Sequence, residues 1–145
     1  MSSPIFRLVY ISRVAHSAGA GSLDDTIAHI LSVSRRNNAR VGVTGALLFS
    51  AGVFAQTLEG PVPAVEGTFE RIQCDPRHHQ VSILQVGYVP DRLFADWSMG
   101  HATGAGVDRF AAIAPDMRLS GPRDAAAGEI VALMGRLVRE DVAVG

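Results

Sequence analysis

The sequence predicts an α+β protein, a ferredoxin-like β-α-β-β-α-β sandwich with an extra short strand and C-terminal helices. Two observations predict this class. Four segments rich in β-branched and aromatic residues lie between residues 5 and 89, and two segments with helical apolar spacing separate them in that order. The length of 145 residues also suits a single core, since domains most often contain about 100 to 150 residues.

The first strand and the first helix are predicted from residues 5–38. Residues 5–12 (IFRLVYIS) carry apolar side chains on both faces, which is typical of a central strand. Ser22 begins a Ser-x-x-acid capping box that predicts a helix over residues 23–38. The apolar stripe of this helix continues into Asn38, so its inner face is expected to become polar at the C-terminal end.

The remaining elements follow from turn residues and hydrophobic periodicity. Residues 44–50 and 53–59 predict two strands joined by a tight hairpin at Ala51-Gly52. The later elements are a helix at 61–74, a strand at 79–89 and a short strand at 94–99.

We expect two regions in the chain. Residues 1–100 form the β-α-β-β-α-β unit, and residues 101–145 form a helical extension. Residues 123–140 place an apolar stripe on one helix face, made of Ile130, Leu133, Met134 and Leu137. Helices on one face of the sheet leave its other face uncovered. The extension therefore packs either on this sheet or on a partner chain, and the sequence does not choose between them.

Composition excludes several classes of protein. With 13 basic and 14 acidic residues the net charge is −1, which argues against a dedicated nucleic-acid binder. The single cysteine, Cys74, excludes an internal disulfide and a Cys-based zinc site, and we expect no metal. No apolar run reaches the roughly 18 residues of a membrane helix, and no secretory signal is visible. We therefore expect a cytoplasmic protein without membrane contact.

Three polar residues occupy positions that are unusual for a plain sandwich. Tyr10 lies in the middle of an apolar strand, Gln56 shares a strand face with Phe54 and Leu58, and Asn38 ends the inner stripe of a helix. Together a phenol and two carboxamides can bind the polar rim of a planar heterocycle. The alternative is that Tyr10 and Gln56 bond each other or the backbone while Asn38 caps its helix.

These residues belong to a set of motifs with a familiar order. The motifs are LVYIS around Tyr10, Asn37-Asn38 before Val43-Thr44-Gly45, FAQTLEG (54–60), RIQCDPRHHQV (71–81) and RLFADWSM (92–99). In this order and at these separations they resemble the BLUF domains, which sense blue light with FAD. The resemblance covers about residues 5–100.

The resemblance implies a flavin between the helices expected at 23–38 and 61–74. It assigns the cofactor contacts to Tyr10, Ser34, Asn37, Asn38, Gln56, Arg71, Asp75, Arg77, His78 and His79. Asn38 matches the asparagine that holds the flavin C4 carbonyl and N3–H. The expected cofactor is FAD, and FMN or riboflavin stay open because the ring contacts are common to all three.

The resemblance also implies a photoswitch without substrate turnover, so we expect no enzyme activity. Light would drive electron and proton transfer from Tyr10 and rearrange the hydrogen bonds of Gln56, giving a red-shifted signalling state. Trp97 and Met99 match the W-x-M of the last strand and would relay the change. As residues two apart on a strand, they are expected to share a face.

The sequence beyond Met99 leaves no room for a cyclase, phosphodiesterase or DNA-binding module, so we expect a short, stand-alone type that signals through an unknown partner protein or its own homo-oligomer. The alternative is a photochemically silent flavin- or small-molecule-binding domain. An acylphosphatase-like hydrolase has the same strand order, but Arg13 with Gly19 and Gly21 imitates its phosphate loop only loosely.

Overall fold

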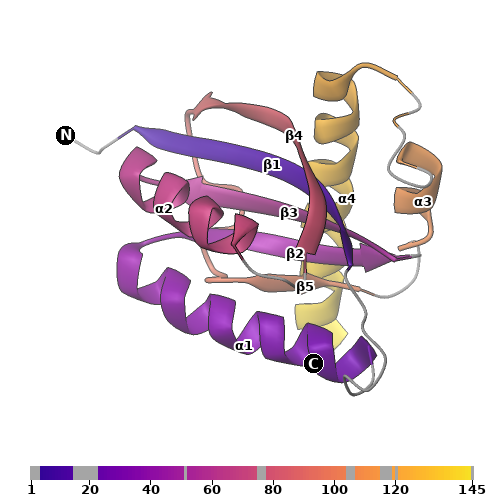
Figure 1. Ribbon diagram of the computed structural model, residues 1–145, viewed down its shortest axis with the longest axis horizontal. Coiled ribbons are helices and arrows are strands. Elements are labelled where there is room, and N and C mark those ends of the chain that lie inside the picture. Colours follow the sequence, from indigo (N-terminus) through magenta and orange to yellow (C-terminus); the bar gives the residue numbers. More distant parts are fainter. Residues whose placement is uncertain are drawn as a thin grey trace.

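The protein forms a five-stranded mixed sheet with helices on both faces (Figure 1). The computed structural model describes residues 4–14, 23–50, 52–74, 78–103, 107–114, 119 and 121–144. Its elements are β1 (Ile5–Val14), α1 (Leu23–Val41), β2 (Thr44–Ser50), β3 (Val53–Gly60), α2 (Val62–Gln73), β4 (His78–Val89), β5 (Gly100–Ala102), α3 (Arg109–Ile113) and α4 (Arg123–Val144). This order confirms the predicted ferredoxin-like α+β class with an extra strand and C-terminal helices.

The strand order is β4-β1-β3-β2-β5. The strands β1, β2, β3 and β4 pair antiparallel, and the short β5 joins β2 in parallel. In the register between β1 and β3, Tyr10 lies directly opposite Gln56. Two strands from distant parts of the sequence therefore bring these two side chains together at the centre of the sheet.

Alternation along the strands produces two hydrophobic clusters, one on each face. On β1, Leu8 and Tyr10 belong to the cluster beneath α1 and α2, whereas Val9 and Ile11 belong to the cluster beneath α4. We call these the α1–α2 cluster and the α4 cluster. Figure 1 shows the same layers, with α1 and α2 in front of the sheet and α4 behind it.

The α4 cluster contains most of the apolar residues of α4. Its buried members on this helix are Ala126, Ala127, Ile130, Val131, Leu133, Met134, Leu137 and Val138. Burial of apolar surface of this extent makes α4 an integral layer of the folded chain. Within the described residues, no helix is both long and apolar enough to span a bilayer.

The prediction of a strand at 94–99 is wrong. These residues form turns and bends, and the last strand begins at Gly100. Their backbone groups bond outside any ladder: the Trp97 N–H donates to the Phe94 carbonyl at 3.0 Å, and the Gly45 N–H donates to the Trp97 carbonyl at 3.1 Å. Alternating side-chain directions therefore do not apply to this segment.

The first helix extends beyond its predicted end at residue 38, whereas α2 is slightly shorter than the predicted 61–74. α1 continues to Val41, so Asn38 lies inside the helix, where its carbonyl accepts the Val43 N–H at 3.0 Å. Asn38 is thus not the helix cap that one reading of the sequence allowed. The capping residue proposed for this helix, Ser22, lies outside the described residues.

Candidate functional site

A buried polar chain runs across the sheet beneath α2. The Tyr10 hydroxyl donates a hydrogen bond to Oε1 of Gln56, and Nε2 of Gln56 donates to the thioether sulfur of Met99 at 3.4 Å. Tyr10 and Met99 are buried, and Gln56 is 2 % exposed. The carboxamide therefore has a strong donor at its oxygen and a weak acceptor at its nitrogen.

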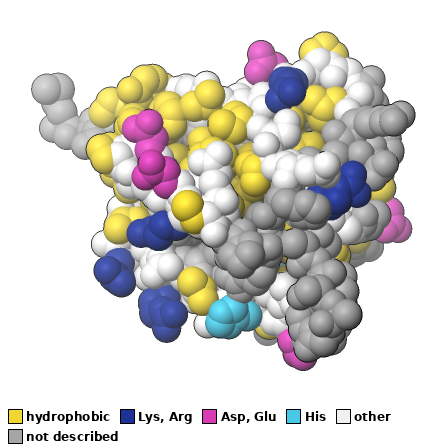
Figure 2. All heavy atoms as spheres, viewed as in Figure 1, with side chains coloured by type: hydrophobic (Ala, Val, Ile, Leu, Met, Phe, Trp, Pro, Cys, Tyr) yellow, Lys and Arg dark blue, Asp and Glu magenta, His cyan; other side chains and the backbone are white. Residues whose placement is uncertain are grey.

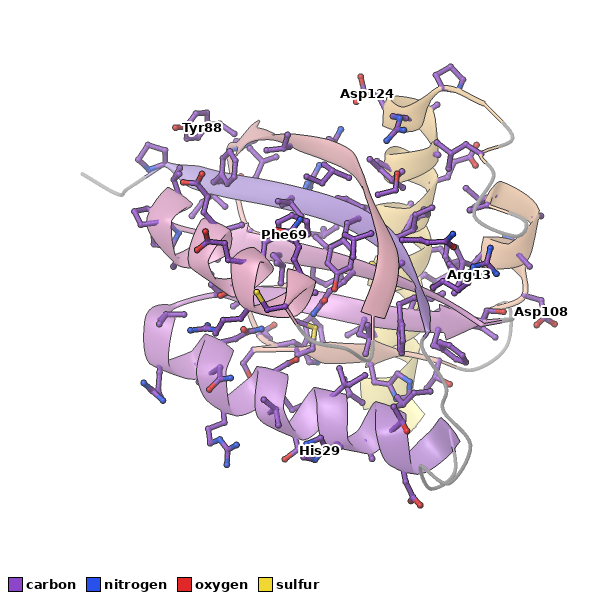
Figure 3. The ribbon with its side chains drawn as sticks, in the orientation of Figure 1. Arg13, His29, Phe69, Tyr88, Asp108 and Asp124 are labelled. Atoms are coloured by element: carbon purple, nitrogen blue, oxygen red, sulfur yellow. The ribbon has the colours of Figure 1, made fainter. Side chains whose placement is uncertain are left out.

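The residues around this chain come from both covering helices. Phe69 of α2, labelled in Figure 3, packs against Tyr10, and the ring centroids lie 5.4 Å apart with planes at 56°. The same cluster receives Val65 from α2 and apolar residues of α1, namely Ile27, Ile30 and Leu31. These side chains place the Tyr10–Gln56 pair at the boundary between the sheet and an apolar region bordered by α1 and α2.

Asn38 carries a buried acceptor atom, Oδ1, that receives no hydrogen bond from the described residues. It is 1 % exposed, and its Nδ2 donates to the Ser98 carbonyl at 2.8 Å. Its Oδ1 has no hydrogen-bond partner among the described residues. Buried carboxamide oxygens are almost always paired, because an unpaired one costs about 1–3 kcal/mol. Asn38 therefore fits a ligand that brings an N–H group to this position, as the resemblance to flavin-binding domains implies.

Arg35 was missed by the sequence reasoning. Its Nε donates to the Met99 carbonyl at 2.9 Å, one turn before the bond from Asn38 to Ser98. The i, i+3 spacing of Arg35 and Asn38 on the predicted helix was the available signal. The two side chains together tie α1 to the segment that carries the sulfur next to Gln56.

Glu59, also missed, holds the other end of the same segment. Its carboxylate is fully buried and accepts the backbone N–H of Leu93 at 2.7 Å and of Phe94 at 2.9 Å, together with the Thr44 hydroxyl at 3.0 Å. Arg92 donates to the Thr44 hydroxyl at 2.9 Å. The position of Glu59 directly after Leu58, at the end of a predicted strand, gave no sign of this role.

The structure separates Trp97 and Met99, which were expected to share a face. Met99 belongs to the α1–α2 cluster, whereas Trp97 packs on the α4 cluster on the opposite face. The turn at 94–97 causes this difference, because its backbone does not follow the two-residue period of a strand. Of the two, Met99 is the one whose sulfur accepts the hydrogen bond from Gln56 described above.

The other predicted site residues lie on α1, α2 and β4 or outside the described residues. Ser34 and Asn37 are half-buried on α1, and Arg71 is exposed on α2, where its Nη2 donates to the Thr68 hydroxyl at 3.4 Å. Asp75 and Arg77 lie outside the described residues. His78 and His79 begin β4, and their side chains also lie outside the description.

Comparison with known proteins identifies relatives for most of the chain. Photoactivated adenylate cyclase subunit beta of Euglena longa is 34 % identical over 102 residues, which cover 70 % of this chain and 11 % of the relative. The blue light- and temperature-regulated antirepressor BluF of Escherichia coli (strain K12) is 38 % identical over 73 residues, covering 50 % of this chain and 18 % of the relative. The chain thus spans a small part of these curated relatives.

Solved structures of similar proteins match a larger part of the chain than the curated relatives do. The dark-state structure of BlrB, a BLUF protein, is 34 % identical with a TM-score of 0.69, covering 90 % of this chain and 96 % of BlrB. The ground state of BlsA is 25 % identical with a TM-score of 0.74, covering 90 % of this chain and 87 % of that structure. Residues 5–100 match the BLUF family, described as sensors of blue light using FAD. With this match over most of its length, the chain belongs to the BLUF family of flavin-binding blue-light sensors.

Proposed function

We propose that this chain is a blue-light photoreceptor whose switch is the buried Tyr10–Gln56–Met99 chain. The observation that carries the proposal is the hydrogen bonding of Gln56, which joins Tyr10 on one side to Met99 on the other. The unpaired Oδ1 of Asn38 adds a buried acceptor for a ring N–H on the same side of the sheet. The bound flavin would supply absorption of blue light and accept an electron.

Asn38 and Gln56 are the proposed contacts to the flavin ring. Oδ1 of Asn38 would accept the ring N–H, and its Nδ2, which now donates to the Ser98 carbonyl, would keep the side chain oriented. Further proposed contacts are Tyr10, Ser34, Asn37, Arg71, Asp75, Arg77, His78 and His79. We propose FAD as the cofactor, with FMN and riboflavin as alternatives.

Gln56 has the properties of a two-position switch. Rotating its carboxamide by half a turn exchanges Oε1 and Nε2, so that the Tyr10 oxygen would face an N–H donor and the Met99 sulfur would face an oxygen. The bond to sulfur is weak, which keeps the free-energy difference between the two positions small. Tyr10 would lose an electron to the bound flavin and its hydroxyl proton to Oε1 of Gln56, so the Tyr10 oxygen would then accept a hydrogen bond from the carboxamide instead of donating one.

We propose two routes by which a change in the hydrogen bonds of Gln56 reaches other parts of the molecule. Met99 responds first, because its sulfur contacts Gln56 and its carbonyl is held by Arg35. The second route starts at Thr57, the next residue of β3, whose hydroxyl donates to the Met134 sulfur of α4 at 3.3 Å. Gln56 and Thr57 point to opposite faces of the sheet. A shift of β3 would therefore also move the contact between Thr57 and α4.

The proposed output of the sensor is supported by the names of its relatives. We propose that the chain turns over no substrate, contacts neither nucleic acid nor membrane, and acts through a partner protein or a homo-oligomer. Among the relatives, the Euglena longa protein is named a photoactivated adenylate cyclase and the Escherichia coli protein an antirepressor. The switch therefore suits a domain that changes its contacts with another protein.

An absorption spectrum of the purified chain in the dark and under blue light tests the proposal. We expect a flavin spectrum that shifts slightly to the red on illumination and recovers in the dark. Tyr10→Phe should keep the flavin and lose the shift, because only the hydroxyl is removed. A flavin spectrum that never shifts would favour the silent flavin-binding alternative, and a colourless protein that takes up no added FAD would overturn both.

A further inference from the structure

The strand β4 departs from regular pairing with β1 beside Tyr10. Val9 of β1 pairs with Gln85. The next residue of β1, Tyr10, pairs with Ile83, so Leu84 is an extra residue of β4 at this point. An extra residue forms a β-bulge and locally disrupts the ladder of backbone hydrogen bonds. The ladder therefore holds β4 less firmly at the residue opposite Tyr10.

A second irregularity of β4 lies close by and contains a strained residue. The register shifts again between Ile11 and Arg13 of β1. In this part of β4, Gln80 has a φ of 54°, in the left-handed region that residues other than glycine rarely adopt. Its Oε1 accepts a hydrogen bond from Nε of Arg13 at 2.8 Å. Residues 80–84 thus lie between two irregularities, and side chains help the ladder to hold them.

Arg123, the first residue of α4, bonds the middle of this segment. Its Nη1 donates to the Ile83 carbonyl at 2.6 Å and to the Ser82 hydroxyl at 3.1 Å. Ile83 is 39 % exposed, and Figure 2 shows that hydrophobic side chains gather on the surface over β4 and the neighbouring part of α2. Burial therefore fixes Ile83 only in part. A hydrogen bond from a charged donor is stronger than one between neutral groups, so Arg123 is a main tie of this residue.

We propose that Arg123 is a positioning residue of the photoswitch and sets how fast the signalling state decays in the dark. This inference rests on the proposed function, because it concerns the Tyr10–Gln56 pair. Residues paired across an antiparallel ladder have Cα atoms about 4.5–5.5 Å apart, so the backbone of Ile83 borders that of Tyr10. By holding Ile83, Arg123 limits the motion of β1 at Tyr10.

The decay of the signalling state depends on this motion. For decay, the carboxamide of Gln56 has to turn back and accept the Tyr10 hydroxyl again, and both side chains are buried. A close-packed interior resists such a rotation unless the neighbouring groups give way. A looser Tyr10 backbone therefore lowers the barrier and speeds the decay.

The segment also contacts α4 through a second group. Leu84 buries its side chain in the α4 cluster, and Arg123 bonds the carbonyl of the residue before it. The lifetime of the signalling state then depends on whether the first turn of α4 stays against β4.

The dark recovery of the flavin spectrum after blue light tests this role. Arg123→Ala should recover about two- to tenfold faster than the unchanged chain, the rate equivalent of one lost hydrogen bond. Flavin affinity and the size of the red shift should stay the same, because Arg123 is exposed and lies outside the Tyr10–Gln56–Met99 chain. Arg123→Lys keeps a charged donor and should restore most of the slow recovery. Arg109→Ala, at an exposed arginine of α3, is the matched control and should recover like the unchanged chain.

Hydrogen exchange in the dark tests the structural step by itself. The backbone N–H groups of residues 81–85 should exchange faster in Arg123→Ala than in the unchanged chain, whereas those of β3 should exchange at the same rate. Equal exchange of residues 81–85 in the two proteins would overturn the proposal, because Arg123 would then not hold the segment.

The outcomes keep this inference separate from the proposed function. A normal red shift together with an unchanged or slower recovery in Arg123→Ala would count against the role of Arg123 alone. A flavin spectrum of the unchanged chain that never shifts would overturn the proposed function, and the role of Arg123 in the switch with it.

Discussion

At the scale of single residues, Gln56 is the group whose hydrogen bonds define the candidate switch. It occupies a strand position where an apolar side chain would pack equally well, since its neighbours on the same face, Phe54 and Leu58, are buried. A buried carboxamide at such a position must be paired, and here the partners are Tyr10 and Met99. The polar chain therefore replaces hydrophobic contact with directional bonds that can be exchanged.

Gln56→Leu tests this directional role. Leucine has a similar volume and keeps the packing, but it removes both the acceptor of the Tyr10 hydroxyl and the donor to the Met99 sulfur. We expect the variant to bind flavin and to show no light-induced red shift in its absorption spectrum. Gln85→Leu, on β4, is the control and should shift normally, since Gln85 bonds only Arg7 in the contacts described. A red shift of full amplitude in Gln56→Leu would contradict the switch.

Asn38→Ala tests the buried acceptor on α1. The change removes Oδ1, which no described residue bonds, and the Nδ2 bond to the Ser98 carbonyl. One hydrogen bond to the ring contributes about 0.5–1.5 kcal/mol, so flavin affinity should fall about two- to tenfold. Fluorescence titration of the apoprotein with flavin measures the change. Ser32→Ala, on the exposed side of α1, is the control and should leave the flavin affinity unchanged. Unchanged affinity in Asn38→Ala would show that Oδ1 does not bind the flavin.

At the scale of elements, the segment between β4 and β5 depends on side chains that come from elsewhere. Glu59 binds the N–H groups of Leu93 and Phe94, while Arg35 and Asn38 bind the carbonyls of Met99 and Ser98. An exposed loop would take these bonds from water, but here they come from β3 and α1. The position of Met99 next to Gln56 is therefore set by two other elements.

Glu59→Gln tests the anchoring of this segment. Glutamine turns one of the two acceptor oxygens of Glu59 into an N–H donor that faces the backbone N–H of Leu93 or Phe94. Leaving such a buried group unpaired costs about 1–3 kcal/mol, so urea unfolding should show a loss of that size. Hydrogen exchange at Leu93 and Phe94 should also become faster. Glu70→Gln on the exposed side of α2 is the control, and equal stability of the two variants would refute the anchoring role.

The same segment explains where reasoning from the sequence succeeded and where it failed. The periodicity of residues 53–59 predicted correctly that Gln56 is buried with Phe54 and Leu58, because alternation in a paired strand is a local property. The pattern of residues 94–99 also suggested a strand, but its backbone is fixed by side chains 35, 60 and 64 positions away in the sequence. A local sequence pattern does not predict contacts between residues so far apart in the chain.

At the scale of the whole molecule, the sheet separates two clusters that share its strands. Gln56 points into the α1–α2 cluster, and the next residue, Thr57, bonds Met134 in the α4 cluster. On the last strand, a Cβ at Gly100 would lie 3.1 Å from both methyl groups of Val138 and 3.3 Å from Cγ of Trp97, so α4 approaches the end of the Met99 segment closely. α4 is therefore positioned to respond to both proposed routes.

Thr57→Val tests whether α4 receives the signal through β3. Valine has the shape of threonine and keeps the packing, but it removes the hydroxyl that donates to the Met134 sulfur at 3.3 Å. We expect the light-induced red shift to be unchanged, because Thr57 points away from the α1–α2 cluster. Hydrogen exchange of α4 near Met134, measured in the dark and under blue light, should differ less between the two states than in the unchanged chain. Thr103→Val, at an exposed position after β5, should keep the full difference. If α4 responds to light as strongly in Thr57→Val as in the unchanged chain, the signal reaches α4 without this hydroxyl, and Met99 with Gly100 is left as the route.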